Sequence, residues 1–243
     1  PDSPVESINV KDGKVCGVTT ADGTEFSAGS VIVAPGPEGA EWLTRVADRI
    51  GLEREHNPVD IGVRVEVPAA VMQPLAESLY ESKFMYSTHS FDDSVRTFCM
   101  CPRGEVVIEK NNGVTTVNGH SYSKRHTENT NFAILVSTNF TKPFNDPISY
   151  GKYVASLANL LGGGVIVQRL GDLRSGRRST ERRIEKNALE PTLKNATPGD
   201  LSFVLPYRYL RDILEMLEAL DKVAPGVNER HTLLYGVEVK FYS

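Results

Sequence analysis

The run NFAILVSTNF, residues 131–140, most strongly constrains the fold of this chain. It is almost continuously apolar and β-branched, which is typical of a strand covered on both faces. We therefore expect it to lie centrally in a sheet. A second run, DIGVRVEVPAA at residues 60–70, predicts a strand that stops at Pro68, because proline cannot donate to a strand ladder.

Further short β-prone segments surround these two runs. KFMYSTHS, VRTFCMC, EVVIEK and VTTVNG lie between residues 83 and 119, separated by Asp-Asp, Pro-Arg-Gly and Asn-Asn-Gly turns. Near the start, Asp12-Gly13 and Asp22-Gly23 are strong hairpin signals. The first 34 residues therefore read as a meander, whose last strand, SVIVA, ends in Ala34-Pro35-Gly36. VIVQRL and LLYGVEVKFY predict two more strands.

Four segments carry helical signals. We expect a helix from Glu38 to Ile50 closed by Gly51, and a proline-interrupted helical stretch from Ala69 to Tyr80. Asp146 and Pro147 begin a third helix that glycines end, and residues 205–226 have an amphipathic helical pattern. Leu170–Asp200 reads as a long polar connection. The predicted class is α+β, a mixed and largely antiparallel sheet with helices packed on it.

Composition excludes several classes of protein. The chain has 243 residues, is 40% hydrophobic and 24% charged, and has a net charge of −4. This balance is ordinary for a globular protein and gives no general case for nucleic-acid or membrane binding. Three cysteines argue against a secreted disulfide framework and for a reducing cytoplasm. The chain starts at Pro1 without Met and stops at Ser243 directly after a strand pattern. We therefore expect a piece of a longer protein.

Two glycine-rich stretches resemble phosphate-binding motifs without matching them. The chain contains no G-x-G-x-x-G, and Gly162-Gly163-Gly164 follows a helix, so these glycines are read as a helix end. GDLRSGRRST, residues 171–180, has P-loop glycine spacing. However, Arg177 stands at the lysine position and Arg178 displaces the hydroxyl residue that a P-loop needs for Mg²⁺.

Seven cations make a basic run in an otherwise acidic chain, and they are Arg169, Arg174, Arg177, Arg178, Arg182, Arg183 and Lys186. Such a run can be a solvated surface loop. It can also be an anion site, because arginine grips phosphate or carboxylate with two hydrogen bonds. The anion would be a cofactor pyrophosphate, an acidic substrate or, least favoured, nucleic acid. We expect Arg169 and Arg177 to face such a cleft.

Cys99 and Cys101 stand two residues apart in a predicted strand, so both side chains are expected on one face. Two such thiols can bind a metal, form a strained bridge or simply pack. A zinc site wants further ligands, and neither Cys16 nor the nearby histidines have matching spacing. We expect no metal and two reduced thiols. They are read either as buried and inert or as a pair beside a redox cofactor.

The polar loop from Val117 to Phe132 precedes the central strand and brings together Asn118, His120, Ser121 and His126. Loops beside a rigid sheet commonly carry binding groups. Because the chain has no nucleophile signature such as G-x-S-x-G, no catalytic triad is assigned here. A surface loop and a functional loop both stay open.

Longer stretches support a resemblance. GKVCGVTTADGTEFSAGSVIVAPG, residues 13–36, is similar to the segment that ends in the Ala-Thr-Gly motif of flavoproteins with two dinucleotide folds, with Pro35 in place of threonine. NPVDIGVRVEVP, RTFCMCPRGEVV, VNGHSY, TNFAILVS, GGGVIVQRLGDLRSGRRST, GDLSFVLPYR and LLYGVEVKFYS resemble a family of bacterial FAD-dependent dehydrogenases. Arg103 departs from that family, which has a small residue at this turn.

The resemblance implies that the glycine fingerprint for FAD precedes this region and that a Gly-Asp-Gly motif follows it. Residues 1–51 would be a stub of the FAD domain, with Ala34, Pro35 and Gly36 at its cofactor-facing strand end. Residues 52–243 would be a substrate or cap domain. The whole protein would be an FAD-dependent oxidoreductase, whereas this piece alone would be inactive and carry no flavin.

The substrate would be a small molecule, with no nucleic acid or membrane as partner. Candidates that face the substrate or the flavin are Arg64, Cys99, Cys101, Arg103, Asn118, His120, Gln168 and Arg169. Two other functions stay open. One is an anion- or RNA-binding module that uses the Arg169–Lys186 segment, and the other is a non-catalytic structural domain.

Overall fold

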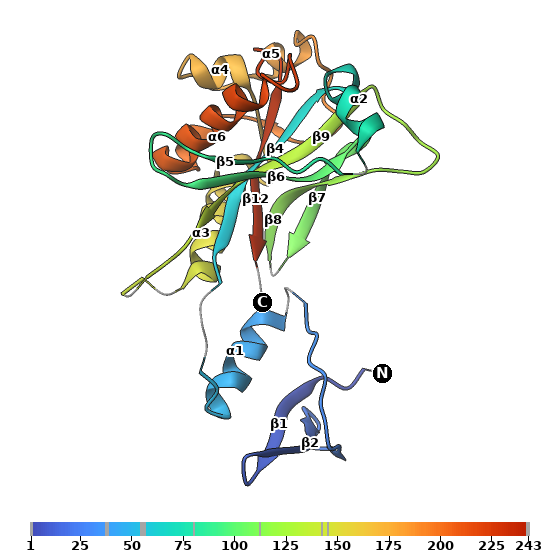
Figure 1. Ribbon diagram of the computed structural model, residues 1–243, viewed down its shortest axis with the longest axis vertical. Coiled ribbons are helices and arrows are strands. Elements are labelled where there is room, and N and C mark those ends of the chain that lie inside the picture. Colours follow the sequence, from blue (N-terminus) through green and yellow to red (C-terminus); the bar gives the residue numbers. More distant parts are fainter. Residues whose placement is uncertain are drawn as a thin grey trace. The chain divides into compact units, whose positions relative to one another are not determined.

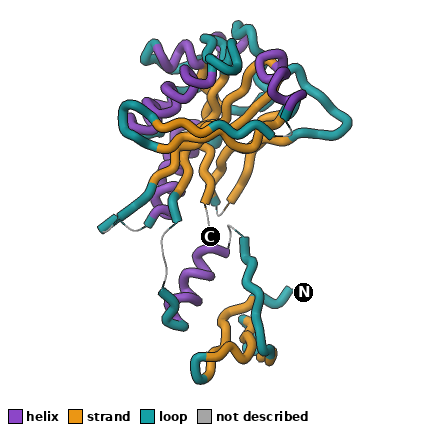
Figure 2. Tube along the Cα trace, viewed as in Figure 1, coloured by secondary structure: helices purple, strands orange, loops and turns teal. Residues whose placement is uncertain are grey.

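The computed structural model describes residues 2–36, 39–53, 57–79, 81–111, 113–141, 143–144 and 146–241. Its contacts divide the chain into two compact units, Pro1–His56 with Ser243, and Asn57–Tyr242. Figure 2 shows the helices and strands of both units. The division falls a few residues after the predicted boundary at residue 51. The assignment of the first unit to an FAD domain stays a prediction.

The first unit contains the predicted meander. Strands β1 (Val5–Lys11), β2 (Lys14–Thr20) and β3 (Glu25–Ser27) pair antiparallel in that order. Gly13 and Gly23 have φ values of 73° and 83°, as tight hairpin turns require. Helix α1 (Ala40–Arg49) follows, and Gly51 closes it with φ 71°. The predicted helix start at Glu38 lies outside the described residues.

The predicted strand SVIVA, residues 30–34, is wrong. These residues take no strand conformation, and the Ile32 side chain is 95% exposed. A strand needs a neighbour that accepts and donates its backbone hydrogen bonds. In the part of the first unit that the structure describes, the sheet ends at β3, so this β-prone run has no partner.

The second unit is built on a seven-stranded sheet in the order β11-β10-β12-β4-β9-β6-β5. Its strands are β4 (Val59–Pro68), β5 (Met85–Ser87), β6 (Ser94–Cys101), β9 (Asn129–Thr138), β10 (Ile166–Arg169), β11 (Thr197–Pro198) and β12 (Leu233–Phe241). Figure 1 labels five of these strands, from β12 to β5. Neighbours pair antiparallel except β10 with β11. The α+β class, the mixed and largely antiparallel sheet and the internal place of NFAILVSTNF are confirmed.

Five helices belong to this unit in the described residues: α2 (Ala69–Ser78), α3 (Pro147–Gly162), α4 (Leu170–Arg174), α5 (Glu181–Glu185) and α6 (Tyr207–Leu220). The predicted caps of α3 are confirmed, because the Asp146 carboxylate accepts from the Ser149 N–H at 3.0 Å and Gly163 has φ 68°. The predicted end of α2 at Tyr80 lies outside the described residues. Leu170–Asp200 is more ordered than predicted, since it forms α4, α5 and β11.

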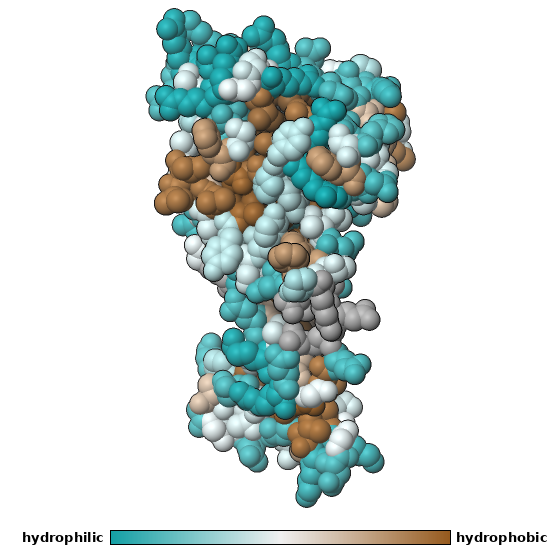
Figure 3. Space-filling model, turned by 90° about the vertical axis from the view of Figure 1, so that its left-hand side faces the viewer, coloured by the Kyte–Doolittle hydropathy of each residue, from teal (hydrophilic) through white to brown (hydrophobic). Residues whose placement is uncertain are grey.

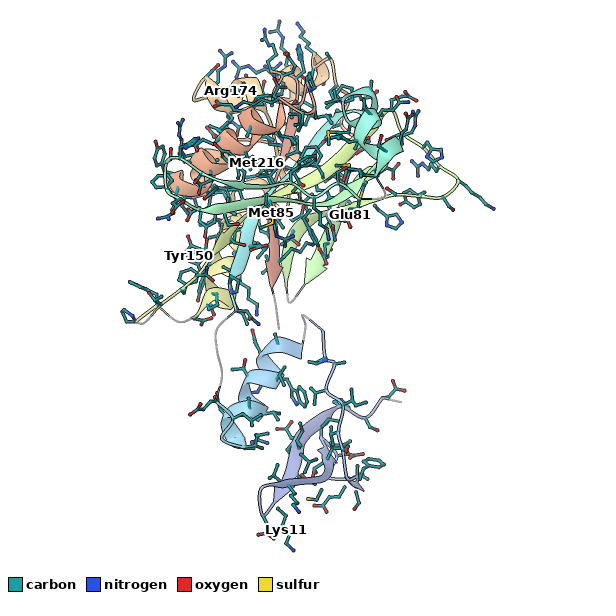
Figure 4. All side chains as sticks on the ribbon, viewed as in Figure 1. Lys11, Glu81, Met85, Tyr150, Arg174 and Met216 are labelled. Atoms are coloured by element: carbon teal, nitrogen blue, oxygen red, sulfur yellow. The ribbon has the colours of Figure 1, made fainter. Side chains whose placement is uncertain are left out.

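The two faces of strand β4 carry different side chains, apolar on one and charged on the other. Its odd-numbered residues, from Val59 to Val67, pack into the main apolar core. Helix α6 covers this core with its apolar face. Met216, which Figure 4 labels, is one of its fully buried residues. The even-numbered residues Asp60, Arg64 and Glu66 point to the opposite face, yet they are equally buried.

The hairpin of β7 (Glu105–Asn111) and β8 (Val114–His120) lies over this second face (Figure 1). Strand β8 contacts β4, β6, β9 and β12. Val106 and Val117 from the hairpin form a smaller apolar core with Val167, Leu189 and Tyr235. The charged residues of β4 are therefore enclosed between the sheet and the hairpin.

Parts of the surface are apolar. Brown, hydrophobic atoms gather on one face of the second unit in Figure 3. Helix α3 exposes Tyr153, Leu157, Leu160 and Leu161. No helix among the described residues has the length and apolar character that a membrane span requires.

Candidate functional site

The three buried charged side chains of β4, Asp60, Arg64 and Glu66, form a polar row, and each has its own partners. Asp60 accepts from the Arg96 guanidinium at 2.8 and 3.0 Å. Glu66 accepts from the Tyr235 hydroxyl at 2.5 Å, from Thr192 and from the Asn129 amide. Buried charges are tolerated only when they are paired and hydrogen-bonded, and the polar row meets that condition.

Arg64 is the centre of what we call the thiol–arginine cluster: Arg64, Cys99, Cys101, Asn131 and Glu238. The guanidinium Nε donates to Asn131 Oδ1 at 2.8 Å, and Nη2 donates to the Cys99 carbonyl at 2.7 Å and to Cys101 Sγ at 3.1 Å. Nη1 lies 3.4 Å from the Glu238 carboxylate. Four elements, β4, β6, β9 and β12, meet at one side chain.

Two glycines bring the covering hairpin and its turn into contact with the thiol–arginine cluster. A Cβ on Gly119 would lie 1.8 Å from Arg64 Nη2 and 2.2 Å from Asn131 Oδ1. A Cβ on Gly104 would lie 2.4 Å from the His120 carbonyl and 3.0 Å from Cys101 Cβ. Since real Cβ atoms do not approach so closely, only glycine lets the backbone close over the guanidinium.

The two thiols lie together for a reason the sequence did not predict. Regular alternation would place them on one face, but the pairing of β6 with β9 slips between Phe98 and Cys101. This slip is a β-bulge, and Cys99 takes φ 47° within it. Their Sγ atoms are 4.0 Å apart, with Cys101 buried and Cys99 half-buried. Strand β6 ends at Cys101, and the predicted Pro-Arg-Gly turn follows it.

The hydrogen bond from Cys101, the Arg64 charge and the Lys240 charge lower the pKa of Cys99 to about 5 against the effect of burial. The bond that Cys101 donates, together with its burial, raises the pKa of Cys101. These two opposite shifts favour a thiolate at Cys99 and a thiol at Cys101. Burial raises the pKa of Glu238, although Arg64 and Lys240 act in the opposite direction.

The remaining hairpin candidates lie nearer the surface. The Asn118 amide donates to Glu109 at 3.1 Å, and the exposed His120 ring lies edge-on to Tyr122 with centroids 4.5 Å apart. Arg103 adopts φ 49° in the turn after β6 and pairs with Glu128 at 3.1 Å. The structure thus brings six of the eight candidates, all except Gln168 and Arg169, to the thiol–arginine cluster, the covering hairpin and the turn that leads into it.

Gln168 and Arg169 lie elsewhere, at the end of β10. The Gln168 amide is buried, and it donates to the Arg177 carbonyl and accepts from the Leu201 N–H. Arg169 pairs through two hydrogen bonds, of 2.8 and 3.0 Å, with Asp172. Asp172 is fully buried, and its pKa is lowered because Arg169 and Ser179 donate to it, which outweighs its burial.

Around this pair lies a hollow of about 460 Å³. We call it the arginine hollow, and it is lined by Arg169, Arg177, Arg178, Thr180, Arg182, Arg183 and Lys186. Arg177 and Arg183 also approach Asp172, at 3.2 and 3.8 Å. Figure 4 labels Arg174, which comes from α4 next to this segment. Both Arg169 and Arg177 line the hollow, and its anion-binding role stays a prediction.

Sequence reasoning missed several residues of these sites. Asp172, Glu66, Asn131 and Glu238 were not singled out, although each is fully buried. Asp172, Asn131 and Glu238 each contact a candidate arginine, and Glu66 belongs to the polar row. A signal existed for Glu238. In YGVEVKF, Glu238 and Lys240 alternate with apolar residues, which places both on one face of a strand.

Ala34, Pro35 and Gly36 were predicted to approach the cofactor. In the first unit, Ala34 and Pro35 line an apolar hollow of about 320 Å³ with Val5, Ile8, Val18, Val31, Ile32, Val33, Gly39 and Trp42. None of these residues is charged, and the chain has no glycine fingerprint to bind a pyrophosphate. The residues present therefore do not fit a whole FAD by themselves. Among the described residues, no group of three or more metal-ligating side chains gathers.

Two comparisons relate the chain to known proteins. It is 25% identical over 261 aligned positions to a Clostridium beijerinckii protein named "Uncharacterized protein", which covers 98% of this chain. The chain spans about half of that relative, 47% of its length. Residues 58–241, almost all of the second unit, match the model of a protein family. The chain belongs to the family described as "FAD-dependent protein, C-terminal domain-like".

Proposed function

We propose that this chain is the substrate domain of an FAD-dependent oxidoreductase that acts on a small molecule. The family match across residues 58–241 carries the proposal. In such an enzyme the redox chemistry belongs to the cofactor, while the protein supplies binding, orientation and electrostatics. This domain supplies a rigid sheet with a covered polar face and accessible polar groups along its hairpin.

Within this proposal, the exposed edge of the covering hairpin contacts the substrate. His120 and Arg103 present an imidazole and a guanidinium at this edge. Arg64 and Glu66 lie beneath it with every hydrogen bond made inside the unit, so they position the hairpin rather than touch substrate. The apolar hollow beside Ala34 faces a further part of the whole protein, which holds the FAD.

The test is a visible absorption spectrum of the full-length protein that contains this chain. We expect the bands of bound oxidised flavin, and we expect the isolated 243-residue chain to be colourless. The flavin bands should bleach anaerobically with a substrate found by screening small metabolites. A His120→Ala variant should raise the substrate concentration needed for half-maximal bleaching about 10-fold, a loss of the size of one hydrogen bond. Lys124→Ala, on the neighbouring loop, is the matched control.

A full-length protein that folds but stays colourless would contradict this proposal. It would favour the alternative of a structural domain without flavin chemistry. If the His120→Ala variant bleaches at the same substrate concentration as the parent, the hairpin edge does not contact the substrate. The flavin spectrum and the substrate titration thus test the two parts of the proposal separately.

The arginine hollow supports a second function, the binding of an anionic group. Arg178, Arg182 and Lys186 line it, and no ion pair with a carboxylate is recorded for them within the described residues. A phosphate or carboxylate would find free donors there. We expect pyrophosphate to bind the chain in calorimetry and Arg182→Gln to weaken binding about 5-fold. Lys222→Gln, an exposed cation outside the hollow, should leave it unchanged.

Nucleic acid would give a different result. Neutralising several RNA phosphates makes affinity fall steeply with salt concentration. Sub-micromolar, salt-sensitive binding of generic RNA would overturn the small-anion assignment and support the RNA-binding alternative.

A further inference from the structure

The thiol–arginine cluster holds two nucleophilic side chains that the proposed function does not use. Cys99 Sγ and Cys101 Sγ are 4.0 Å apart, one half-buried and the other buried. We propose that Cys99 and Cys101 form a redox-active dithiol that exchanges with small disulfides of the glutathione type, with Cys99 as the attacking group and Cys101 as the resolving group. This activity requires no flavin and stands apart from the substrate-domain proposal.

The bulge in β6 gives the pair a geometry that a disulfide can span. In a regular strand, residues two apart have Cα atoms about 6.6 Å from each other, near the upper limit of about 6.8 Å for a bridge. In β6 the three steps from Phe98 to Cys101 match only two steps of β9, from Ala133 to Asn131. The backbone between Phe98 and Cys101 is therefore compressed, and the two sulfurs on it lie 4.0 Å apart.

The surroundings give the two sulfurs different roles. Arg64 Nη2 donates to Cys101 Sγ and to the Cys99 carbonyl. Lys240 adds a second positive charge, 3.5 Å from Glu238 and 3.4 Å from Glu109. Cys99 is the more accessible of the two sulfurs, which suits it to attack an external disulfide. The bond from Cys101 and the charges of Arg64 and Lys240 also lower the pKa of Cys99, whereas the pKa of Cys101 is raised. A thiolate, and not a thiol, attacks a disulfide.

The exchange proceeds in two displacements. The Cys99 thiolate attacks one sulfur of R–S–S–R, a Cys99–S–R bond forms, and R–S⁻ leaves. Cys101 then loses its proton to the departed thiolate and attacks Cys99 Sγ, which expels a second R–S⁻. The protein dithiol is oxidised by two electrons and the small disulfide is reduced to two thiols, one of them leaving as thiolate. The reverse reaction reduces the bridge.

The first test follows the products by intact-protein mass spectrometry. The 243-residue chain carrying Cys16→Ser is reduced, freed of reductant and mixed with oxidised glutathione. We expect a product lighter by two hydrogen atoms and without glutathione. In the Cys101→Ser variant, one glutathione should remain attached at Cys99. In the Cys99→Ser variant, the rate of reaction should fall at least 10-fold.

Two outcomes would overturn the proposal. One is that Cys99→Ser reacts as fast as the parent, because Cys101 would then be the attacking group. The other is that the parent keeps a mixed disulfide with glutathione and never closes the bridge. Either result would be read on chains whose circular dichroism matches the parent, so a folding defect cannot imitate it.

The second test measures the pH dependence of iodoacetamide labelling of Cys99 in the Cys16→Ser chain. The rate should be half-maximal near pH 5 and level above pH 7, because Cys99 has its pKa lowered to about 5. An ordinary thiol, with a pKa of about 8.5, keeps gaining rate about 10-fold per pH unit up to pH 8. A midpoint at or above pH 8 would overturn the assigned roles.

Two charge variants test which positive charge lowers the pKa of Cys99. Lys240→Gln should move the midpoint to higher pH, because it removes a cation that acts on Cys99. Lys110→Gln removes a positive charge from the exposed part of β7 and should leave the midpoint where it is. Arg64 is not replaced in this test, since its burial makes folding depend on it.

Discussion

Replacing Asp212 by asparagine should stabilise the protein at neutral pH and do so less in acid. Asp212 lies on α6 and is fully buried. Neither of its carboxylate oxygens makes a hydrogen bond of good geometry within the described residues, although the Thr88 and Asp93 side chains lie close enough to influence its pKa. Burial, with the nearby Asp93 charge as a further cause, raises the pKa of Asp212 from 3.8 to about 6. The folded protein thus holds a proton there more tightly than the unfolded chain does.

The sign and size follow from proton linkage. A carboxyl whose pKa is higher in the folded state favours folding fully below its unfolded pKa. This stabilisation is lost as the pH rises through the pKa of the folded state. With 3.8 and about 6 as the unfolded and folded pKa values, burial of this carboxyl lowers the free energy of unfolding by about 3 kcal/mol at pH 7.5 and by about 1 kcal/mol at pH 4.5, at about 1.4 kcal/mol per pH unit. At pH 7.5 the folded group is ionised, whereas at pH 4.5 it must take up a proton that most unfolded chains lack. Asparagine, uncharged at both pH values, removes this cost.

The assay is urea unfolding of the parent and Asp212→Asn chains at pH 4.5 and 7.5, followed by circular dichroism. The stabilisation should be about 2 kcal/mol larger at pH 7.5, which is a midpoint shift of about 1 M for a slope of about 2 kcal/mol per M. Glu218→Gln, an exposed carboxylate on the same helix, should change stability by less than about 0.5 kcal/mol at both pH values. An Asp212→Asn effect that is equal at the two pH values would refute the reasoning.

Two further substitutions test the Arg169–Asp172 pair and the close approach of Gly119 to Arg64. Asp172→Ala should cost about 3–5 kcal/mol in urea unfolding at pH 7, because it leaves the Arg169 guanidinium buried without its partner. The cost should shrink as pH falls through the lowered pKa of Asp172, since the parent then loses the same contribution, and a constant cost in acid would contradict this. Gly119→Ala should lower the melting temperature by several degrees, because its Cβ would lie 1.8 Å from Arg64 Nη2. Gly164→Ala, whose Cβ has room at 3.8 Å, is the control, and an equal loss in both variants would count against the close approach.

Local sequence signals predicted most elements of the fold. The Asp12-Gly13 turn, the Asp146 cap and the Gly163 helix end depend on residues adjacent in the chain, and the structure shows all three. The SVIVA segment failed because its β-branched residues favour a strand only where a neighbour is present to pair. Leu170–Asp200 read as a connection because its two helices have only five residues each, too few to show a helical period.

The candidate site was less predictable, because distant segments decide its environment. The alternation of residues along β4 puts Arg64 and Glu66 on the sheet face opposite the apolar core. In antiparallel sheets the second face is commonly exposed to water. That the β7–β8 hairpin covers it depends on contacts some fifty residues away in the chain. The bulge at Cys99 was equally hidden, since it follows from the register with β9. Asp172 could be recognised only once Arg169 was seen to pair with it.

The polar row has a structural consequence that apolar side chains could not provide. Buried ion pairs cost so much desolvation that apolar replacements of similar volume are often as stable or more so. Asp60, Arg64 and Glu66 therefore contribute specific hydrogen-bond partners rather than net stability. Glu66 accepts only where Thr192 and its segment are in register, and Arg64 fits only under a residue without Cβ, which is Gly119. These contacts fit the arrangement in which Gly119 lies over Arg64 and Thr192 reaches Glu66. The apolar side of β4 thus stabilises the domain, and its polar side determines which segments close over the thiols.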